Sequence, residues 1–198
     1  MAPYVNTYQP NGFKAYNLAE GSAYSTRRPV PAVRTANTGG LIANTDLSAG
    51  DAISFDVNGN VYRSGPNDTV RGVIKGFEFQ ALSNNPPGSA INSIGNYLTG
   101  NGGAAGTTPI AYTLDIEDSK CLFEVAVASG QSVTQANIGQ SFNLQDGAPD
   151  PFYGNSTQVL NVNTPGTQFQ LIDIKFSPED NNPGVNARVI VRCLQMIS

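Results

Sequence analysis

The chain has 198 residues, with 11 basic and 15 acidic side chains, no histidine and a formal net charge of −4. An acidic chain in which only 13% of residues are charged lacks the basic surface that nucleic-acid binding needs. The absence of histidine removes the commonest general base and transition-metal ligand, and no apolar run approaches the length of a membrane span.

Strand and turn residues dominate the composition. There are 21 glycines and 13 prolines, apolar residues alternate over short stretches, and no window keeps a helical period with caps. We therefore expect an all-β fold: a small β-barrel or sandwich body with long loops and an extended N-terminal arm. The polar opening MAPYVNTYQPNG is unlike a secretory signal, so we expect synthesis in the cytoplasm.

Residues 1–40 form the predicted extended N-terminal arm. They hold four basic residues against one acid, a local charge of +3, whereas the rest of the chain carries −7. They also hold four of the eight tyrosines, and disordered tails are usually poor in aromatic residues. An arm that docks on an acidic protein surface is therefore favoured over a solvated tail. The candidate contact residues are Tyr4, Tyr8, Phe13, Tyr16, Tyr24, Arg27 and Arg28.

Residues 41–82 form a first predicted β module. Apolar and polar residues alternate over 53–57, and Asn58-Gly59 supplies the positive φ angles of a tight hairpin turn. A polar turn follows, and a further strand is expected over 69–79. The register of the hairpin stays open at this stage. A two-residue loop would set Phe55 opposite Tyr62, and a three-residue loop would set Val57 opposite Val61.

Residues 83–109 form a Gly- and Asn-rich insertion or linker, and residues 110–198 a second β unit. The insertion is either a surface loop between the β units or a tip that reaches a neighbouring subunit. In the second unit, alternation and turn residues predict a barrel or sandwich. Its strands are expected over 110–116, 122–127, 141–144, 156–162, 169–176 and 189–194.

The sequence offers little chemistry for catalysis. The carboxylates Asp115, Glu117 and Asp118 lie at a predicted turn, where acids are normally solvated. The calcium-like run over 56–60 lacks the glutamate that closes such a loop. No nucleophile elbow occurs. We expect no enzyme activity, no cofactor and no metal site. We expect the two cysteines, Cys121 and Cys193, to be buried reduced thiols.

Several stretches resemble the small capsid decoration (cement) proteins of tailed bacteriophages. The central motif is LSAGDAISFDVNGNVYR followed by VRGVIKGFEF, similar to the Gly-Asp, hairpin, Gly-Val core of that family. The opening is NGFKAYNLAEGSAYSTRRPVPA, in which Ala15 stands where the family usually has proline. Two later stretches, LFEVAVASGQSVTQANIGQSFNL and FQLIDIKFSPEDNNPGVNARVIVRC, resemble its closing strands. Together they cover about three quarters of the chain.

The resemblance implies a structural virion protein located on the capsid surface. It would bind the outer surface of a phage capsid and stabilise the shell, with the major capsid protein as partner and self-association as a homotrimer. In this reading the N-terminal arm supplies the contacts, and deletion of residues 1–40 abolishes capsid binding while the β body stays folded. Nucleic acid and membrane are not expected partners.

A second hypothesis is a phage fibre or adhesin module that binds a host surface glycan. The stacking residues would then be Tyr97, Phe152 and Tyr153, which lie in the predicted loops 83–109 and 147–154. A third is a small enzyme of a histidine-free type, which is disfavoured because the sequence shows no catalytic motif. The number of copies in each particle separates these hypotheses, because a decoration protein is present in many copies and a fibre in few.

Overall fold

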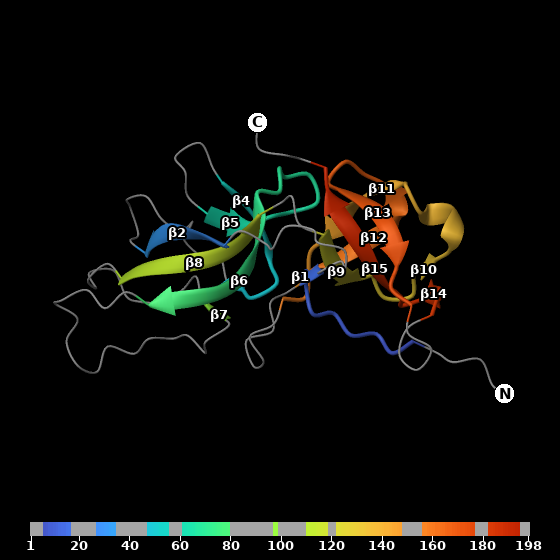
Figure 1. Cartoon of the computed structure of the whole chain (residues 1–198), viewed down its shortest axis with the longest axis horizontal. Coiled ribbons are helices and arrows are strands. Elements are labelled where there is room, and N and C mark those ends of the chain that lie inside the picture. Colours follow the sequence, from blue (N-terminus) through green and yellow to red (C-terminus); the bar gives the residue numbers. More distant parts are fainter. Residues whose placement is uncertain are drawn as a thin grey trace.

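The structure, a computed structural model, consists of antiparallel β-sheets (Figure 1). It describes residues 6–16, 27–34, 47–55, 61–79, 97–98, 110–118, 122–147, 156–176 and 182–194. The only helix among these residues is the short 3-10 turn η1 (Gln135–Asn137). The expected all-β fold is therefore confirmed for the part of the chain that the structure describes. None of these residues forms a helix long and apolar enough to cross a membrane.

The larger sheet has six antiparallel strands, and it occupies the right side of Figure 1. Its order is β1 (Lys14–Tyr16), β9 (Leu122–Ala126), β15 (Arg188–Cys193), β13 (Phe169–Ile174), β11 (Ser141–Gln145) and β12 (Val159–Pro165). Alternate side chains point to opposite faces, so Val189 and Val191 are buried while Arg192 is exposed. This alternation gives the sheet one apolar face and one mixed face.

The second sheet has five strands, and it lies on the left of Figure 1. Its order is β2 (Arg27–Arg34), β8 (Ile110–Asp118), β6 (Gly72–Phe79), β4 (Ala52–Phe55) and β5 (Val61–Arg63). β2 is an edge strand with two prolines, Pro29 and Pro31, at alternate positions. Proline has no N–H to donate, so we infer that both lie at positions whose backbone nitrogen faces away from β8, which removes two donors from that edge.

Two short sheets complete the architecture. β10 (Ser132–Val133) pairs with β14 (Gly184–Val185), and β3 (Leu47–Ser48) pairs with β7 (Tyr97–Leu98), which lies within the predicted insertion. The six-stranded sheet curls until β12 approaches the end of β9, where one parallel bridge joins Val127 to Leu160. A single bridge is not a ladder, and the barrel is therefore not closed.

The apolar faces of the two sheets share one core. Ala52, Val70 and Val73 come from the five-stranded sheet and its connections, and they belong to the same buried cluster as the apolar face of the six-stranded sheet. The cluster also contains Phe13, from the segment that precedes β1. The largest buried side chains in it are Phe13, Phe123, Phe142, Phe169 and Leu144.

The predicted strands of the second β unit correspond to β8, β9, β11, β12, β13 and β15, with boundaries that move by a few residues. The predicted hairpin is present as β4 and β5, but in neither expected register. Phe55 pairs with Val61, and Ile53 with Arg63. We attribute this to tertiary contacts, because this register brings Arg63 to the buried Asp51. The residues of the turn itself, 56–60, lie outside the described part.

Candidate functional site

The sequence-predicted contact residues do not gather into one site. Tyr4 and Tyr24 lie outside the described residues. Arg27 and Arg28 begin the edge strand β2, where they pair with Glu117 and Ile116 of β8, and the structure does not describe their side chains. The remaining three aromatic residues lie on or in the six-stranded half of the molecule.

Phe13 is a core residue. It is only 1% exposed, and its ring stacks on Phe169 with centroids 4.7 Å apart and meets Phe123 edge-on at 6.4 Å. Its backbone N–H donates to the carbonyl of Gly50 at 2.8 Å, next to the start of β4. Phe13 therefore fixes the N-terminal segment to the body and is not available as a contact for another protein. Deletion of residues 1–40 would remove this core side chain, so the deletion cannot test binding alone.

The segment before Phe13 is held at two further points. Asn6 is buried, and its side-chain amide donates to the carbonyls of Asn182 (2.8 Å) and Val185 (2.9 Å) while accepting from the N–H of Asn182 (2.9 Å). Tyr8 is half-buried and packs against the small cluster of Ala126, Ala128 and Val159. Residues 6–16 thus form a strap across the six-stranded half. Part of the predicted arm is bound to its own chain.

An ion cluster built around the buried Asp51–Arg63 pair joins the two sheets, and we call it the Arg63 cluster (Asp51, Arg63, Asp146 and Thr157). Arg63, at the end of β5, donates through Nε to Asp51 Oδ1 at 2.9 Å. Its Nη1 lies 2.7 Å from Asp146 Oδ1 and also donates to the carbonyl of Gly147, just after β11. Nη2 reaches Thr157 Oγ1 at 3.5 Å. One guanidinium therefore ties the hairpin to both strands at the edge of the larger sheet.

Burial dominates the electrostatics of this cluster. The side chain of Asp51 is 0% exposed and that of Arg63 is 7% exposed. Desolvation raises the pKa of Asp51 above its ordinary value, and it outweighs the opposing effects of the Arg63 cation and the N–H of Ser48. Desolvation also raises the pKa of Asp146, again against the Arg63 cation. Because Arg63 pairs with Asp51 at β4 and with Asp146 after β11, we interpret the cluster as a structural link.

Two buried glutamines reinforce the same junction. Gln158 accepts from the N–H of Ala52 at 2.6 Å and donates to the carbonyl of Ser64 at 2.9 Å. Gln168 accepts from the N–H of Leu144 at 2.9 Å and donates to two carbonyls of the turn that follows β5. Buried amides of this kind are costly unless they are paired, and here Gln158 pairs with backbone at β4 and β5, whereas Gln168 pairs with backbone from both sides of the junction. The junction is therefore specified by polar contacts as well as by the core.

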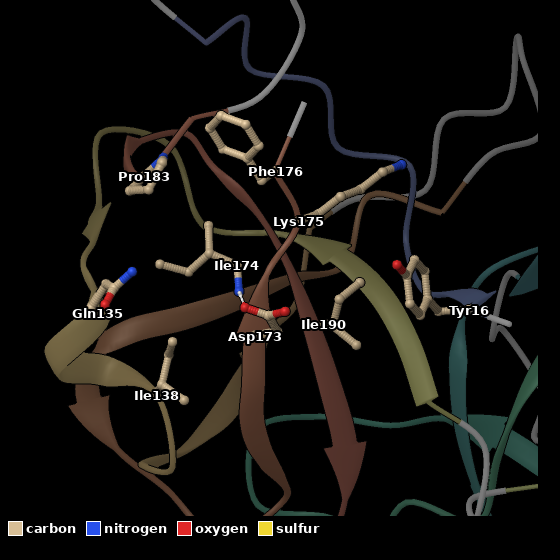
Figure 2. A pocket seen from close by; sticks show the side chains of 9 residues that line it. All are labelled: Tyr16, Gln135, Ile138, Asp173, Ile174, Lys175, Phe176, Pro183 and Ile190. Carbon is tan, nitrogen blue, oxygen red and sulfur yellow. Dashed lines mark hydrogen bonds between the residues drawn. The ribbon is translucent and has the colours of Figure 1, made fainter. Parts of the chain in front are cut away.

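An open hollow of about 330 Å³ lies on the mixed face of the six-stranded sheet. Figure 2 shows the carboxylate of Asp173 near its middle, with Gln135 and Ile138 on one side and Ile190 and Tyr16 on the other. The full lining consists of Tyr16, Gln135, Ile138, Asp173, Ile174, Lys175, Phe176, Pro183 and Ile190. Tyr16 is thus a sequence-predicted contact residue that borders this hollow.

The sequence did not predict the Arg63 cluster or the hollow. Asp51 and Arg63 lie in a hairpin that the alternation predicts, but their partner Asp146 comes more than eighty residues later, and no linear spacing links them. Among the described residues, no group of three or more His, Cys, Asp or Glu side chains could hold a metal ion. Cys193 is buried in the core, and Cys121 lies outside the described part, so the redox state of the pair stays a prediction.

Comparison with known proteins identifies no relative: no protein-family model, no curated protein and no solved structure matches the chain. Functional inference therefore depends on the residues and geometry described above and on the resemblance of the sequence motifs.

Proposed function

We propose that this protein is a structural virion protein that binds the outer surface of a phage capsid and stabilises the shell, with the major capsid protein as its partner. The motif resemblance supports this role. The structural observation that carries it is an all-β body in which the Arg63 cluster, Gln158 and Gln168 are committed to joining the two sheets. Such an interior favours a rigid building block rather than a centre of chemistry.

In this role, stabilisation comes from buried area summed over many copies. A contact of about 800 Å² for each partner is typical of a specific interface, and several linked copies raise the avidity without any new contact. We propose a homotrimer as the binding unit, as the resemblance implies. A rigid body also suits this mechanism, because few groups lose freedom when it docks.

The test is co-sedimentation of the purified protein with expanded capsids that lack it. We expect saturable binding at about micromolar concentration or below, and competition by an excess of unlabelled protein. Light scattering checks the trimer, since three copies of a 20.8 kDa chain are readily distinguished from one. Absence of saturable binding to the shell would refute the proposal. Retention on host glycans without capsids would instead support the adhesin hypothesis.

A further inference from the structure

Four large hydrophobic side chains are exposed among the described residues: Ile138 (40%), Phe176 (67%), Val185 (48%) and Leu194 (38%). Ile138 and Phe176 line the hollow, and Val185 lies in the short strand that follows its wall residue Pro183. Clustered exposed apolar residues are typical of a surface that another molecule covers.

The hollow is preformed. Its floor contains Ile174 and Ile190, which are 6% and 3% exposed and belong to paired strands. One wall includes η1, where the N–H of Thr134 at the N-terminal end donates to Asn137 Oδ1 at 2.8 Å. Little backbone ordering would accompany binding, and preorganisation of this kind favours affinity. A volume of about 330 Å³ is at the lower end of the range for ligand pockets.

The charge inside the hollow indicates what it would accept. Asp173 is exposed, and its Oδ1 accepts from the N–H of Ile174 at 2.7 Å. The cation beside it, Lys175, is already paired with Glu124 at 2.7 Å, and Glu124 also lies 3.5 Å from Arg188. No ion pair to Asp173 occurs among the described residues. The recess thus presents a carboxylate within apolar walls (Figure 2).

We propose that this hollow is the docking site for a segment of the shell protein in which an apolar side chain lies next to a lysine or arginine. The apolar group fills the space between Ile138 and Phe176, and the cation or its N–H donors pair with Asp173. Protein is favoured over glycan because the deepest lining side chains, Ile174 and Ile190, are apolar and nearly buried, and they offer no hydrogen bond to a sugar hydroxyl. The inference rests on the proposed function, since it names the contact surface.

Two pairs of variants test the site in the co-sedimentation assay. Phe176→Ser removes the exposed ring, and Leu194→Ser is its control, because Leu194 is exposed but does not line the hollow. Asp173→Asn removes the carboxylate and raises the net charge by one. Its control is Thr164→Lys, which raises the net charge by the same amount at the exposed end of β12. Melting temperatures of all four should match the wild type, since each residue is exposed.

We expect Phe176→Ser to weaken shell binding by about tenfold or more, as for an interface anchor, and Leu194→Ser to leave it within about twofold. Asp173→Asn should weaken binding by about threefold to tenfold and make it less sensitive to salt, whereas Thr164→Lys should do neither. If the wild type binds and the hollow variants bind equally well, the docking site lies elsewhere and only this inference fails. If the wild type does not bind the shell, the proposed function fails and the named partner is overturned with it. Retention on glycans that depends on Phe176, without binding to the shell, would also overturn the shell protein as the proposed partner.

Discussion

Replacement of Arg63 by methionine is the most informative perturbation of the fold. Methionine keeps a long apolar stem but removes the guanidinium that pairs with Asp51 at 2.9 Å and Asp146 at 2.7 Å. The side chain of Asp51 is 0% exposed, so it would be left as a buried charge without its cation. Breaking a buried pair in this way typically costs about 3–5 kcal/mol, and the carbonyl of Gly147 also loses a donor. Since small domains are stable by about 5–15 kcal/mol, the loss would be a large fraction of the total.

The assay is urea denaturation followed by far-UV circular dichroism at pH 7. Arg192→Met is the matched control, because Arg192 is exposed and donates to Gln170 at 2.6 Å, and this change should cost about 0–1 kcal/mol. In the Arg63→Met variant the pKa of Asp51 should rise further, since desolvation is then opposed by fewer charges. Asp51 is then protonated in the native state at a higher pH than in the unfolded chain, and protonation removes the unpaired buried charge. The loss of unfolding free energy relative to the wild type should therefore shrink as the pH falls from 7 towards 4. A loss below about 1 kcal/mol, or a deficit that grows on acidification, would refute this account of the cluster.

Three further changes probe the strap and the junction by the same denaturation assay. Phe13→Ala should destabilise by about 3–5 kcal/mol, as expected for a fully buried aromatic residue; a loss below about 1 kcal/mol would contradict its place in the core. Gly12→Ala should cost more than Gly130→Ala, since both glycines have positive φ (63° and 75°) but only at Gly12 would the new Cβ meet Ser156, 2.4 Å away. Equal losses would argue against that close approach. Gln158→Leu should cost about 2–5 kcal/mol because it leaves a buried N–H and a buried carbonyl unpaired, and near-neutral behaviour would show that water replaces them.

Alternation alone predicted most of the strands, because inward and outward side chains differ in polarity along β9, β13 and β15. The hairpin register could not be obtained in the same way. Turn length suggested two pairings, but the observed pairing of Ile53 with Arg63 brings Arg63 to the buried Asp51, directly before β4. Local sequence does not show that Asp51 is buried by the rest of the fold, nor that Arg63 also reaches Asp146 in the second β unit.

The role of the aromatic residues near the N-terminus was harder to predict for a related reason. A segment rich in aromatic residues is favoured both in a core and at an interface, because the same burial of apolar area drives both. Phe13 lies in the core, Tyr8 covers a small cluster on the same chain, and Tyr16 borders the hollow. The composition indicated that these side chains pack against protein, but not whether that protein is the same chain or a partner.

Residues 6–16 therefore connect stability to recognition. Asn6 donates to the carbonyls of Asn182 and Val185, on either side of the lining residue Pro183. Phe13 lies in the core, and Tyr16 forms one end of the hollow itself. Loss of capsid binding after removal of the whole N-terminal region would follow equally from a lost contact and from a collapsed body. Substitutions at Phe176 and Asp173 separate the two, because these side chains are exposed and the core beneath them is untouched. A binding defect in such variants, at unchanged stability, would locate recognition in the hollow rather than in the chain that frames it.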